Sequence, residues 1–472
     1  MRNLLLMLIL TCVAIPRGVS QTHGPLSTSV YQTEDDARKG KFYNAKIPTA
    51  PGWTKNAVIY EMNTRQFSNE GTFAAIEPRV QELKDLGVTI MWFMPIHPIG
   101  EKNRKGALGS YYSVKDYYGI NPEFGALEDF QRLVDLFHHA GIHVIIDLVA
   151  NHTAWDNPLI LDHPEWYRRD ATGRIVAPVA DWSDVADLNY DKPELWDYMI
   201  RMMEYWVRDI GIDGFRCDVA EMVPMEFWVK ARTALDAIKP VFMLAEGESP
   251  ELHASGFDMT YSFAMHKVFN DIPSGKKSIR AIDELFRLEA KNYPKGSMRM
   301  RFTSSHDENS WNRSEIVRMG RDGAKVGAVL SFTLPGHPLI YAGQEVGNER
   351  SLAFFERDPI EWKENEFRPL YQTLSRLYKN SPALYQGGMK KIASDNDDRI
   401  YAFLRYEESD SVLVVVNFSA GAFDGRLHVT GIDGEFNDIF SGESIHLTGG
   451  KISVKMAPWE YHVYTRAAHL KK

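Results

Sequence analysis

Three carboxylates stand at the ends of short apolar runs in three separate parts of the chain. They are Asp218, Glu246 and Asp307, which close the runs 212–218, 241–246 and 300–307. An apolar strand that stops at a lone carboxylate, with a helical segment after it, is how a parallel barrel presents reactive groups at its C-terminal rim. Residues 147–152, Asp-Leu-Val-Ala-Asn-His, make a fourth strand end of this kind. The pattern predicts acid–base and nucleophilic chemistry on a glycosidic bond.

A retaining glycosidase needs a nucleophilic carboxylate and a general acid about 5–5.5 Å apart. We interpret Asp218 as the nucleophile and Glu246 as the general acid and base. Glu246 must hold its proton near neutral pH, so we expect burial to raise its pKa. Glu248 is the alternative acid, but we expect it to be a solvated loop residue, as we do for Glu308 beside Asp307.

Arg216 precedes the predicted nucleophile by two residues, on the same face of a strand. A nearby guanidinium lowers the pKa of a carboxylate, so we expect Arg216 to keep Asp218 ionised. Alternation then turns the apolar side chains of Phe215 and Cys217 to the opposite face. The alternative is a purely structural Arg–Asp pair on the rim of a barrel.

Strand-like and helix-like segments alternate from residue 55 to 385, which predicts an α/β fold with a closed parallel sheet. The predicted strands are 57–62, 88–94, 142–149, 212–218, 241–246, 257–261, 300–304 and 338–342. The predicted helices are 77–86, 127–139, 195–209 and 225–238. Asp191, with Glu194 three residues later, predicts a capping box for the third helix. We therefore expect a (β/α)8 TIM barrel.

Two further regions complete the predicted architecture. Residues 153–190 lack a long period and follow the third strand, which predicts an inserted loop subdomain. After residue 385 the pattern alternates with a period of two, which predicts a C-terminal antiparallel β-sandwich domain. The expected division is a signal peptide at 1–20, an N-terminal extension at 21–54, the barrel at 55–385 with its insertion, and the sandwich at 386–472.

The first twenty residues have the features of a secretory signal. Arg2 supplies the charge, residues 4–15 the apolar stretch, and residues 18–20 the small side chains before a cleavage point. The stretch is too short to anchor the chain in a bilayer, and no later segment looks membrane-spanning. We expect an exported protein, periplasmic or secreted. Cys12 would leave with the signal, so Cys217 would be the one remaining cysteine and no intrachain disulfide could form.

Composition narrows the classes of partner. The formal net charge of the 472 residues is −9, and loss of Arg2 and Arg17 with the signal makes it more negative by two. This argues against nucleic acid or an anionic membrane as partner and suits a neutral ligand. Aromatic residues make up 12% of the chain, and their rings can bind sugar faces as well as fill cores. The oligomeric state cannot be read from the sequence.

These residues resemble the signature blocks of the α-amylase superfamily, glycoside hydrolase family 13. The blocks are matched, in the family's order, by residues 147–152, 214–218, 244–246 and 305–307, with an extra block at 187–189. The likeness covers roughly residues 55–466. It implies a retaining hydrolase of α-1,4-glucosidic bonds in starch-like α-glucans or malto-oligosaccharides. A transglycosylase, an α-glucosidase or a sugar isomerase on the same fold remains the alternative. A non-catalytic glycan-binding protein is less favoured because all three acids are present.

The resemblance also implies roles for individual residues. Asp307 would bind ring hydroxyls and stabilise the cationic transition state. The other expected substrate contacts are Tyr112, Asp147, His152, Arg216 and His306. Asn151 resembles a ligand of a structural calcium ion between barrel and insertion, and calcium takes oxygen ligands. No cofactor is expected for the chemistry itself.

Three departures from the family pattern concern specificity and metal binding. Val219 follows the nucleophile, as in members that accept α-1,6 linkages, so some tolerance for those bonds is expected. Met222 replaces a histidine that often supplies a calcium-binding carbonyl, and Ser305 replaces the asparagine before His-Asp. These changes leave the predicted reaction class unaltered.

Overall fold

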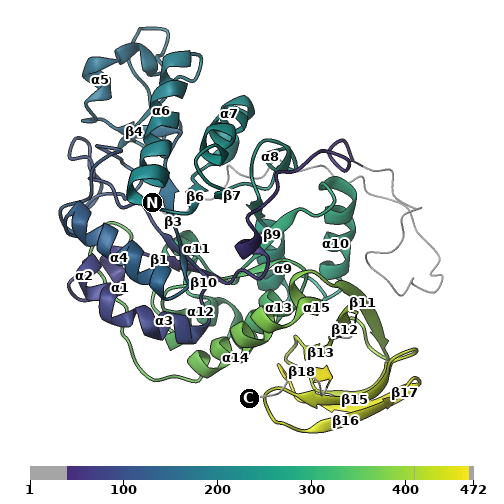
Figure 1. Ribbon diagram of the computed structural model, residues 1–472. Coiled ribbons are helices and arrows are strands. Elements are labelled where there is room, and N and C mark those ends of the chain that lie inside the picture. The colour runs from purple at the N-terminus through teal and green to yellow at the C-terminus, as the bar shows by residue number, and fades with distance from the viewer. Residues whose placement is uncertain (1–39, 409, 467–472) are drawn as a thin grey trace.

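The computed structural model describes residues 40–408 and 410–466 (Figure 1). The predicted signal peptide and residues 21–39 of the predicted extension lie outside this part of the chain. Across the two described ranges, no helix has the length and apolar character needed to cross a membrane.

Parallel strands close into a barrel in the order β1-β10-β9-β8-β7-β6-β3-β2, which confirms the predicted fold class. Its strands are β1 (Ile59–Met62), β2 (Ile90–Phe93), β3 (His143–Leu148), β6 (Gly214–Cys217), β7 (Phe242–Ala245), β8 (Met259–Tyr261), β9 (Met298–Arg301) and β10 (His337–Tyr341).

Helices surround the barrel (Figure 1). They are α1 (Thr64–Phe67), α2 (Phe73–Ile76), α3 (Val80–Leu86), α4 (Leu127–His139), α6 (Pro193–Tyr205), α7 (Met225–Asp236), α8 (Glu251–Ala254), α9 (Phe263–Asp271), α10 (Ala281–Asn292), α11 (His306–Asn312), α12 (Glu315–Met319), α13 (Arg321–Thr333), α14 (Phe367–Asn380) and α15 (Pro382–Tyr385).

Strand alternation produces two cores. One lies inside the barrel and includes Ile59, Trp92 and Tyr261. The other lies between strands and helices and includes Phe215 and Cys217, as expected from their place on β6. Arg216, between them, points to the inside and is fully buried. Among the described residues Cys217 is the one free cysteine, and burial raises the pKa of its thiol well above the ordinary value.

Two local predictions were wrong. Helix α6 begins at Pro193, and its N-cap residue Lys192 makes no side-chain cap bond, so Asp191 and Glu194 form no capping box. Proline favours the first helical position because its φ is already fixed there. Strand β9 begins at Met298 and ends at Arg301, earlier than predicted. Asp307 consequently lies in the first turn of α11.

The insertion after β3 contains the two-stranded antiparallel sheet of β4 (His152–Ala154) and β5 (Val185–Asp187), with the short helix α5 (Leu159–Asp162). It rises beside α6, at one end of the barrel (Figure 1). The first strand of this sheet begins within the block 147–152, so the chain enters the insertion directly from the rim.

The C-terminal part is an antiparallel sheet with the order β16-β15-β18-β13-β12-β11-β14-β17, folded as a sandwich around its own core. Its strands are β11 (Gly388–Ser394), β12 (Ile400–Glu407), β13 (Asp410–Asn417), β14 (Phe423–His428), β15 (Asp433–Asp438), β16 (Ser444–Thr448), β17 (Lys451–Met456) and β18 (Tyr461–Arg466). The domain lies against α13–α15 (Figure 1). Buried Arg405 binds the carbonyl of Thr333, at 2.8 Å, and that of Leu384, at 2.7 Å.

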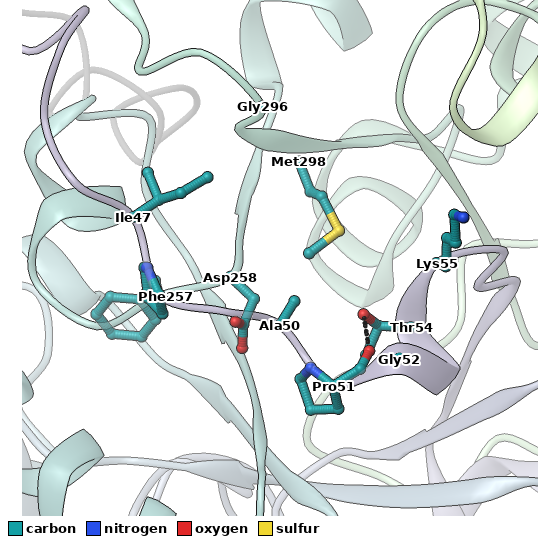
Figure 2. A pocket seen from close by; sticks show the side chains of 11 residues that line it. Ile47, Ala50, Pro51, Gly52, Thr54, Lys55, Phe257, Asp258, Gly296 and Met298 are labelled. Carbon is teal, nitrogen blue, oxygen red and sulfur yellow. Dashed lines mark hydrogen bonds between the residues drawn. The ribbon is translucent and has the colours of Figure 1, made fainter.

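A mainly apolar pocket of about 320 Å³ lies at the end of the barrel where strands begin (Figure 2). The segment 47–55, which leads into β1, forms one wall, and Phe257, Asp258 and Met298 form the other. The predicted catalytic carboxylates follow the opposite, carboxyl ends of the strands. This pocket is therefore not the predicted active site.

Candidate active site

Strand register brings the candidate residues together at the carboxyl ends of neighbouring strands. Asp147 on β3 is paired with Arg216 on β6, and Cys217 with Ala245 on β7. Asp218 and Glu246 are the next residues along β6 and β7. Adjacent strands lie about 4.7–4.9 Å apart, so the register alone makes these side chains neighbours.

The guanidinium of Arg216 is the centre of the site. Its Nη1 lies 2.9 Å from Asp147 Oδ1 and 2.9 Å from Asp218 Oδ1, and its Nη2 lies 3.0 Å from Glu246 Oε1. Its Nε donates to the hydroxyl of Tyr261 at 3.2 Å. One buried cation therefore orients three carboxylates.

Asp218 and Glu246 interact with each other as well as with Arg216. Burial raises the pKa of Asp218 above its ordinary value, and Arg216 and a hydrogen bond with Glu246 oppose that rise without cancelling it. Burial also raises the pKa of Glu246, as expected for a general acid. The rise at Asp218 is opposite to the lowering expected from Arg216, because burial outweighs the effect of the guanidinium.

The backbone after the nucleophile helps to hold the acid. The N–H of Val219 donates to Glu246 Oε2 at 2.8 Å. Val219 has φ +37° and ψ +47°, a left-handed conformation that is strained for a β-branched residue. The strained residue is therefore also the one whose N–H holds Glu246.

Asp147 supports the site from below. It is fully buried, and besides Arg216 it accepts bonds from Trp92 Nε1, at 3.2 Å, and Tyr112 Oη, at 3.3 Å. Burial raises its pKa to about 7, against the opposing effect of Arg216. Although we expected Asp147 among the substrate contacts, its burial makes it a residue that positions others.

Asp307 and His306 form the opposite wall. The side chain of Asp307 is 48% exposed, so it faces open space beside the buried pair. Nε2 of His306 lies 2.8 Å from Tyr112 Oη, and Nδ1 contacts the buried carboxylate of Glu61 on β1. Burial would lower the pKa of His306, but Asp307 and Glu61 raise it to about 9. His306 is therefore an imidazolium at neutral pH.

Family models match most of the chain. Residues 41–174 and 178–398 match the model of the alpha amylase catalytic domain, and residues 389–463 match that of the maltogenic amylase C-terminal domain. The chain belongs to the α-amylase family. It is accordingly a glycoside hydrolase, and the cluster around Arg216 is its candidate active site.

Individual proteins support the same assignment. Alpha-amylase 2 of Dictyoglomus thermophilum is 26% identical over 460 residues, which span 89% of this chain and 78% of that protein. The structure of a maltogenic α-amylase from Thermotoga neapolitana is 32% identical with a TM-score of 0.82, covering 88% of this chain and 99% of that one. An α-amylase structure from Lactobacillus plantarum, also 32% identical, has a TM-score of 0.80 and covers 88% of this chain and 100% of that one.

In this α-amylase family member, Ser305 is the N-cap residue of α11. Its side chain accepts a hydrogen bond from the N–H of Glu308 and so caps α11, the helix that carries Asp307. Serine and asparagine are about equally good N-caps. The departure from the family's asparagine is therefore compatible with the same placement of the acid.

The site around Asn151 and His152 joins barrel and insertion. Both are buried, and Asn151 Nδ2 lies 3.3 Å from His152 Nδ1. Burial lowers the pKa of His152 to about 4, so it is neutral, and its ring packs edge-on against Trp182. Asp187, which is paired with His152 across the small sheet, binds Arg168 at 3.4 Å.

These contacts give the expected calcium site no support. The amide of Asn151 faces an imidazole, and the nearby carboxylate of Asp187 already faces a guanidinium. Over the described ranges, no group of three histidine, cysteine or acidic side chains could hold a metal ion, but calcium also binds amide and carbonyl oxygens. Calcium at Asn151 remains a prediction, and no step of the chemistry depends on it.

Two acids are less solvated than predicted. Glu248 accepts from Arg299 Nη2 at 2.9 Å and from the N–H of Ala264 at 3.1 Å, and burial raises its pKa. Glu308 lies 3.4 Å from Arg318 and 3.6 Å from His266. Glu248, after β7, is paired with Arg299 on β9, whereas Glu308 on α11 lies against Arg318 on α12 and His266 on α9. Neither replaces Glu246 or Asp307 in the cluster around Arg216.

Glu61 is a site residue that we did not identify from the sequence. It is fully buried, and its Oε2 has no hydrogen-bond partner among the described residues. The signal was a charged residue inside the apolar run 57–62, which is unusual in a barrel strand. Its partner His306 is 245 residues away, so the pairing itself could not be read from local pattern.

Proposed function

We propose that the protein is an exported, retaining hydrolase that cleaves α-1,4-glucosidic bonds in malto-oligosaccharides or starch-like α-glucans. The observation that carries this proposal is the convergence of Asp218 and Glu246 on the Arg216 guanidinium, at 2.9 and 3.0 Å, with Asp307 opposite. The similar proteins are named as α-amylases, one of them maltogenic, and this supports the choice of an α-glucan substrate.

The first half of the reaction forms a covalent glycosyl-enzyme. A carboxylate oxygen of Asp218 attacks the anomeric carbon while the bond from that carbon to the leaving oxygen breaks. Glu246 gives its proton to the leaving oxygen, so the departing sugar is neutral. As positive charge develops on the ring, the Asp307 carboxylate stabilises it.

The second half releases the product. Glu246, now ionised, takes a proton from a water molecule whose oxygen bonds to the anomeric carbon as the bond to Asp218 breaks. Both carboxyls return to their starting state, and the product keeps the α configuration. Tyr112 and the cationic His306, joined at 2.8 Å, lie on the Asp307 side, where they can orient the ring being attacked.

The test is the anomer formed first. Early proton NMR spectra of maltotriose hydrolysis should show the α-anomer before mutarotation. The Asp218→Asn variant serves as the control and should give no product. If the β-anomer appears first, the mechanism is inverting and the assignment of Asp218 as nucleophile is wrong. Products longer than maltotriose would instead show that a sugar, and not water, attacks the intermediate.

Linkage preference is a finer part of the proposal. Val219 is only partly buried and lies beside Glu246, where the leaving sugar departs. We expect α-1,4 cleavage to dominate, with measurable cleavage of α-1,6 bonds, because pocket contacts of this size discriminate by about 1–3 kcal/mol. Initial rates on maltotriose and panose compare the two bonds. If the enzyme hydrolyses maltotriose rapidly but leaves the α-1,6 bond of panose intact, the proposed tolerance for α-1,6 bonds is wrong.

Export is proposed from residues 1–20 alone. Expression of the full chain should deliver protein to the periplasm or medium with its N-terminus close to residue 21, as N-terminal sequencing would show. A chain that keeps Met1 and stays in the cytoplasm would contradict it.

A further inference from the structure

Trp311 is an exposed ring on the wall of the site that Asp307 and His306 form. It follows Asp307 by four residues on α11, so both side chains lie on the same face of that helix. Its side chain is 42% exposed, whereas the other large rings around the site are partly or fully covered. Ligand-binding sites are lined mainly by hydrophobic and aromatic side chains, and this exposed ring lies beside the reaction site.

Trp311 is the outer end of a row of rings. Its centroid lies 5.4 Å from that of Phe354, with 36° between the planes. Phe354 is stacked with Tyr112 at 6.2 Å and 14°, and Tyr112 with His306 at 5.4 Å and 25°. The inner end of the row is thus the wall of the reaction site, and the row leads outward from it.

Hydrogen bonds fix the elements that carry these rings. Asn309 on α11 binds the loop after β10 twice, through the carbonyl of Arg350 at 3.0 Å and the N–H of Leu352 at 2.8 Å. The same loop accepts a bond from the loop after β2, at 3.0 Å between Leu108 N and Phe355 O. Because the rings are fixed in advance, a ligand would not have to order them on binding.

Strand order places the row on one side of the bond to be cleaved. Its residues follow β9, β10 and β2, which are grouped with β1 on one side of the closed barrel. Glu246 follows β7 and is held by Val219 after β6, on the other side. The leaving sugar departs at Glu246, so the row lies toward the sugar that is attacked and the units that precede it.

We propose that Trp311, together with Phe354, binds the second glucose unit on the non-reducing side of the scissile bond. The indole face would cover the apolar face of this pyranose ring, one unit beyond the sugar held by Tyr112, His306 and Asp307. This inference rests on the proposed function and extends it to a specificity-determining contact. With this contact, the substrate binds preferentially so that at least two glucose units lie on the non-reducing side of the bond that is cleaved.

The test uses p-nitrophenyl α-maltotrioside, whose three bonds leave three, two or one glucose units on the non-reducing side. Cleavage with one unit gives p-nitrophenyl maltoside, and cleavage with two gives p-nitrophenyl glucoside. Trp311→Ala should raise the ratio of maltoside to glucoside about tenfold, a typical effect of removing one aromatic anchor. Trp311→Phe should return the ratio toward the wild-type value. Because the ratio is measured within one sample, the folded fraction of each variant cancels.

Phe440→Ala is the matched control, since Phe440 is a 37% exposed ring in the C-terminal domain, packed on Tyr461. It should leave the ratio unchanged. An unchanged ratio in an active Trp311→Ala enzyme overturns the inference, and so does a shift toward p-nitrophenyl glucoside, which would place the ring on the leaving side. If wild-type enzyme forms none of the products, the proposed function fails and the inference with it, an outcome distinct from an unchanged ratio.

Discussion

Two clusters of arginine and carboxylate side chains in the barrel differ in charge balance. The catalytic cluster consists of Arg216, Asp147, Asp218 and Glu246, and the β9 cluster consists of Arg299, Arg301, Glu289 and Glu248. In the catalytic cluster one guanidinium serves three carboxylates. In the β9 cluster two guanidiniums serve two.

The pKa of Glu289 follows this balance, whereas burial raises that of the less fully paired Glu248. Burial alone would raise the pKa of Glu289, but Arg301 and Arg299 lower it to about 2, with Arg301 Nη2 at 2.6 Å from Oε2. In the catalytic cluster burial prevails, and the pKa values of Asp218 and Glu246 are raised. Burial and ion pairing are common to both clusters, so neither identifies a reactive site. An excess of carboxylates over cations distinguishes the catalytic cluster from the β9 cluster, because it leaves a proton that can move.

Removing the nucleophile should have the largest effect. Asp218→Asn should lower kcat on maltotriose by at least about 10⁴-fold, because an amide cannot form the glycosyl-enzyme. The matched substitution in the β9 cluster, Glu289→Gln, should leave kcat per folded molecule within about twofold of wild type. Equal losses of activity in the two variants would show that the comparison does not separate chemistry from structure.

Stability should respond in the opposite order. Glu289→Gln leaves two buried guanidiniums short of a carboxylate, so the free energy of unfolding should fall by about 3 kcal/mol at pH 7. Because the folded pKa of Glu289 is depressed, its contribution is present above the unfolded value near 4.3 and is lost as pH falls toward about 2. Urea unfolding of both proteins at pH 7 and pH 3 measures this. A difference that stays constant between those pH values would contradict the ion-pair account.

Glu61 provides a smaller, pH-dependent test of the catalytic side. Its charge helps to raise the pKa of His306 to about 9, so Glu61→Gln should lower that pKa. The alkaline limb of kcat/KM should move to lower pH, with activity at pH 8 reduced about tenfold relative to pH 6 if one protonation controls it. A uniform loss at all pH values would indicate a packing defect and not a change in the charge of His306.

The smallest effect concerns stability at the catalytic cluster. The pKa of Asp218 is raised, so its stabilising contribution is complete below the unfolded value and is lost as pH rises through the folded value. Asp218→Asn should therefore stabilise the fold at pH 8, by about 1 kcal/mol, and the gain should vanish near pH 4. Thermal unfolding at the two pH values checks the sign. If Asp218→Asn is instead destabilised at pH 8, the favourable interaction of the ionised Asp218 with Arg216 outweighs the cost of burying its charge.

The sequence predicted the parts of the site that local pattern determines. Asp218 and Glu246 each stand at the end of an apolar run that forms a barrel strand, so both could be located to the residue. The alternation of side chains along a strand correctly predicted that Phe215 and Cys217 face outward. In the C-terminal domain the sequence predicted strands at 399–406, 411–418, 426–429 and 460–464. It did not predict β15, β16 and β17, which are largely exposed, although β16 and β17 alternate polar and apolar residues. These elements depend on partners elsewhere in the chain.

Contacts over long sequence separations explain the remaining misses. Glu61 meets His306 across 245 residues, and Phe354 meets Tyr112 across a similar distance along the chain. Glu248 looked solvated because its partner Arg299 lies on β9, 51 residues later. Such pairs arise only when the barrel closes and brings β1, β9 and β10 side by side.

Cys217 provides a thiol that can be labelled on β6, the strand that leads to the nucleophile. It is fully buried next to Asp218, and apart from Cys12 in the first twenty residues it is the only cysteine in the sequence. A thiol-specific reagent can therefore label the chain from residue 21 onward only when β6 separates from the helices outside it. The labelling rate reports how often this strand opens, so the local opening of the catalytic segment can be timed separately from global unfolding.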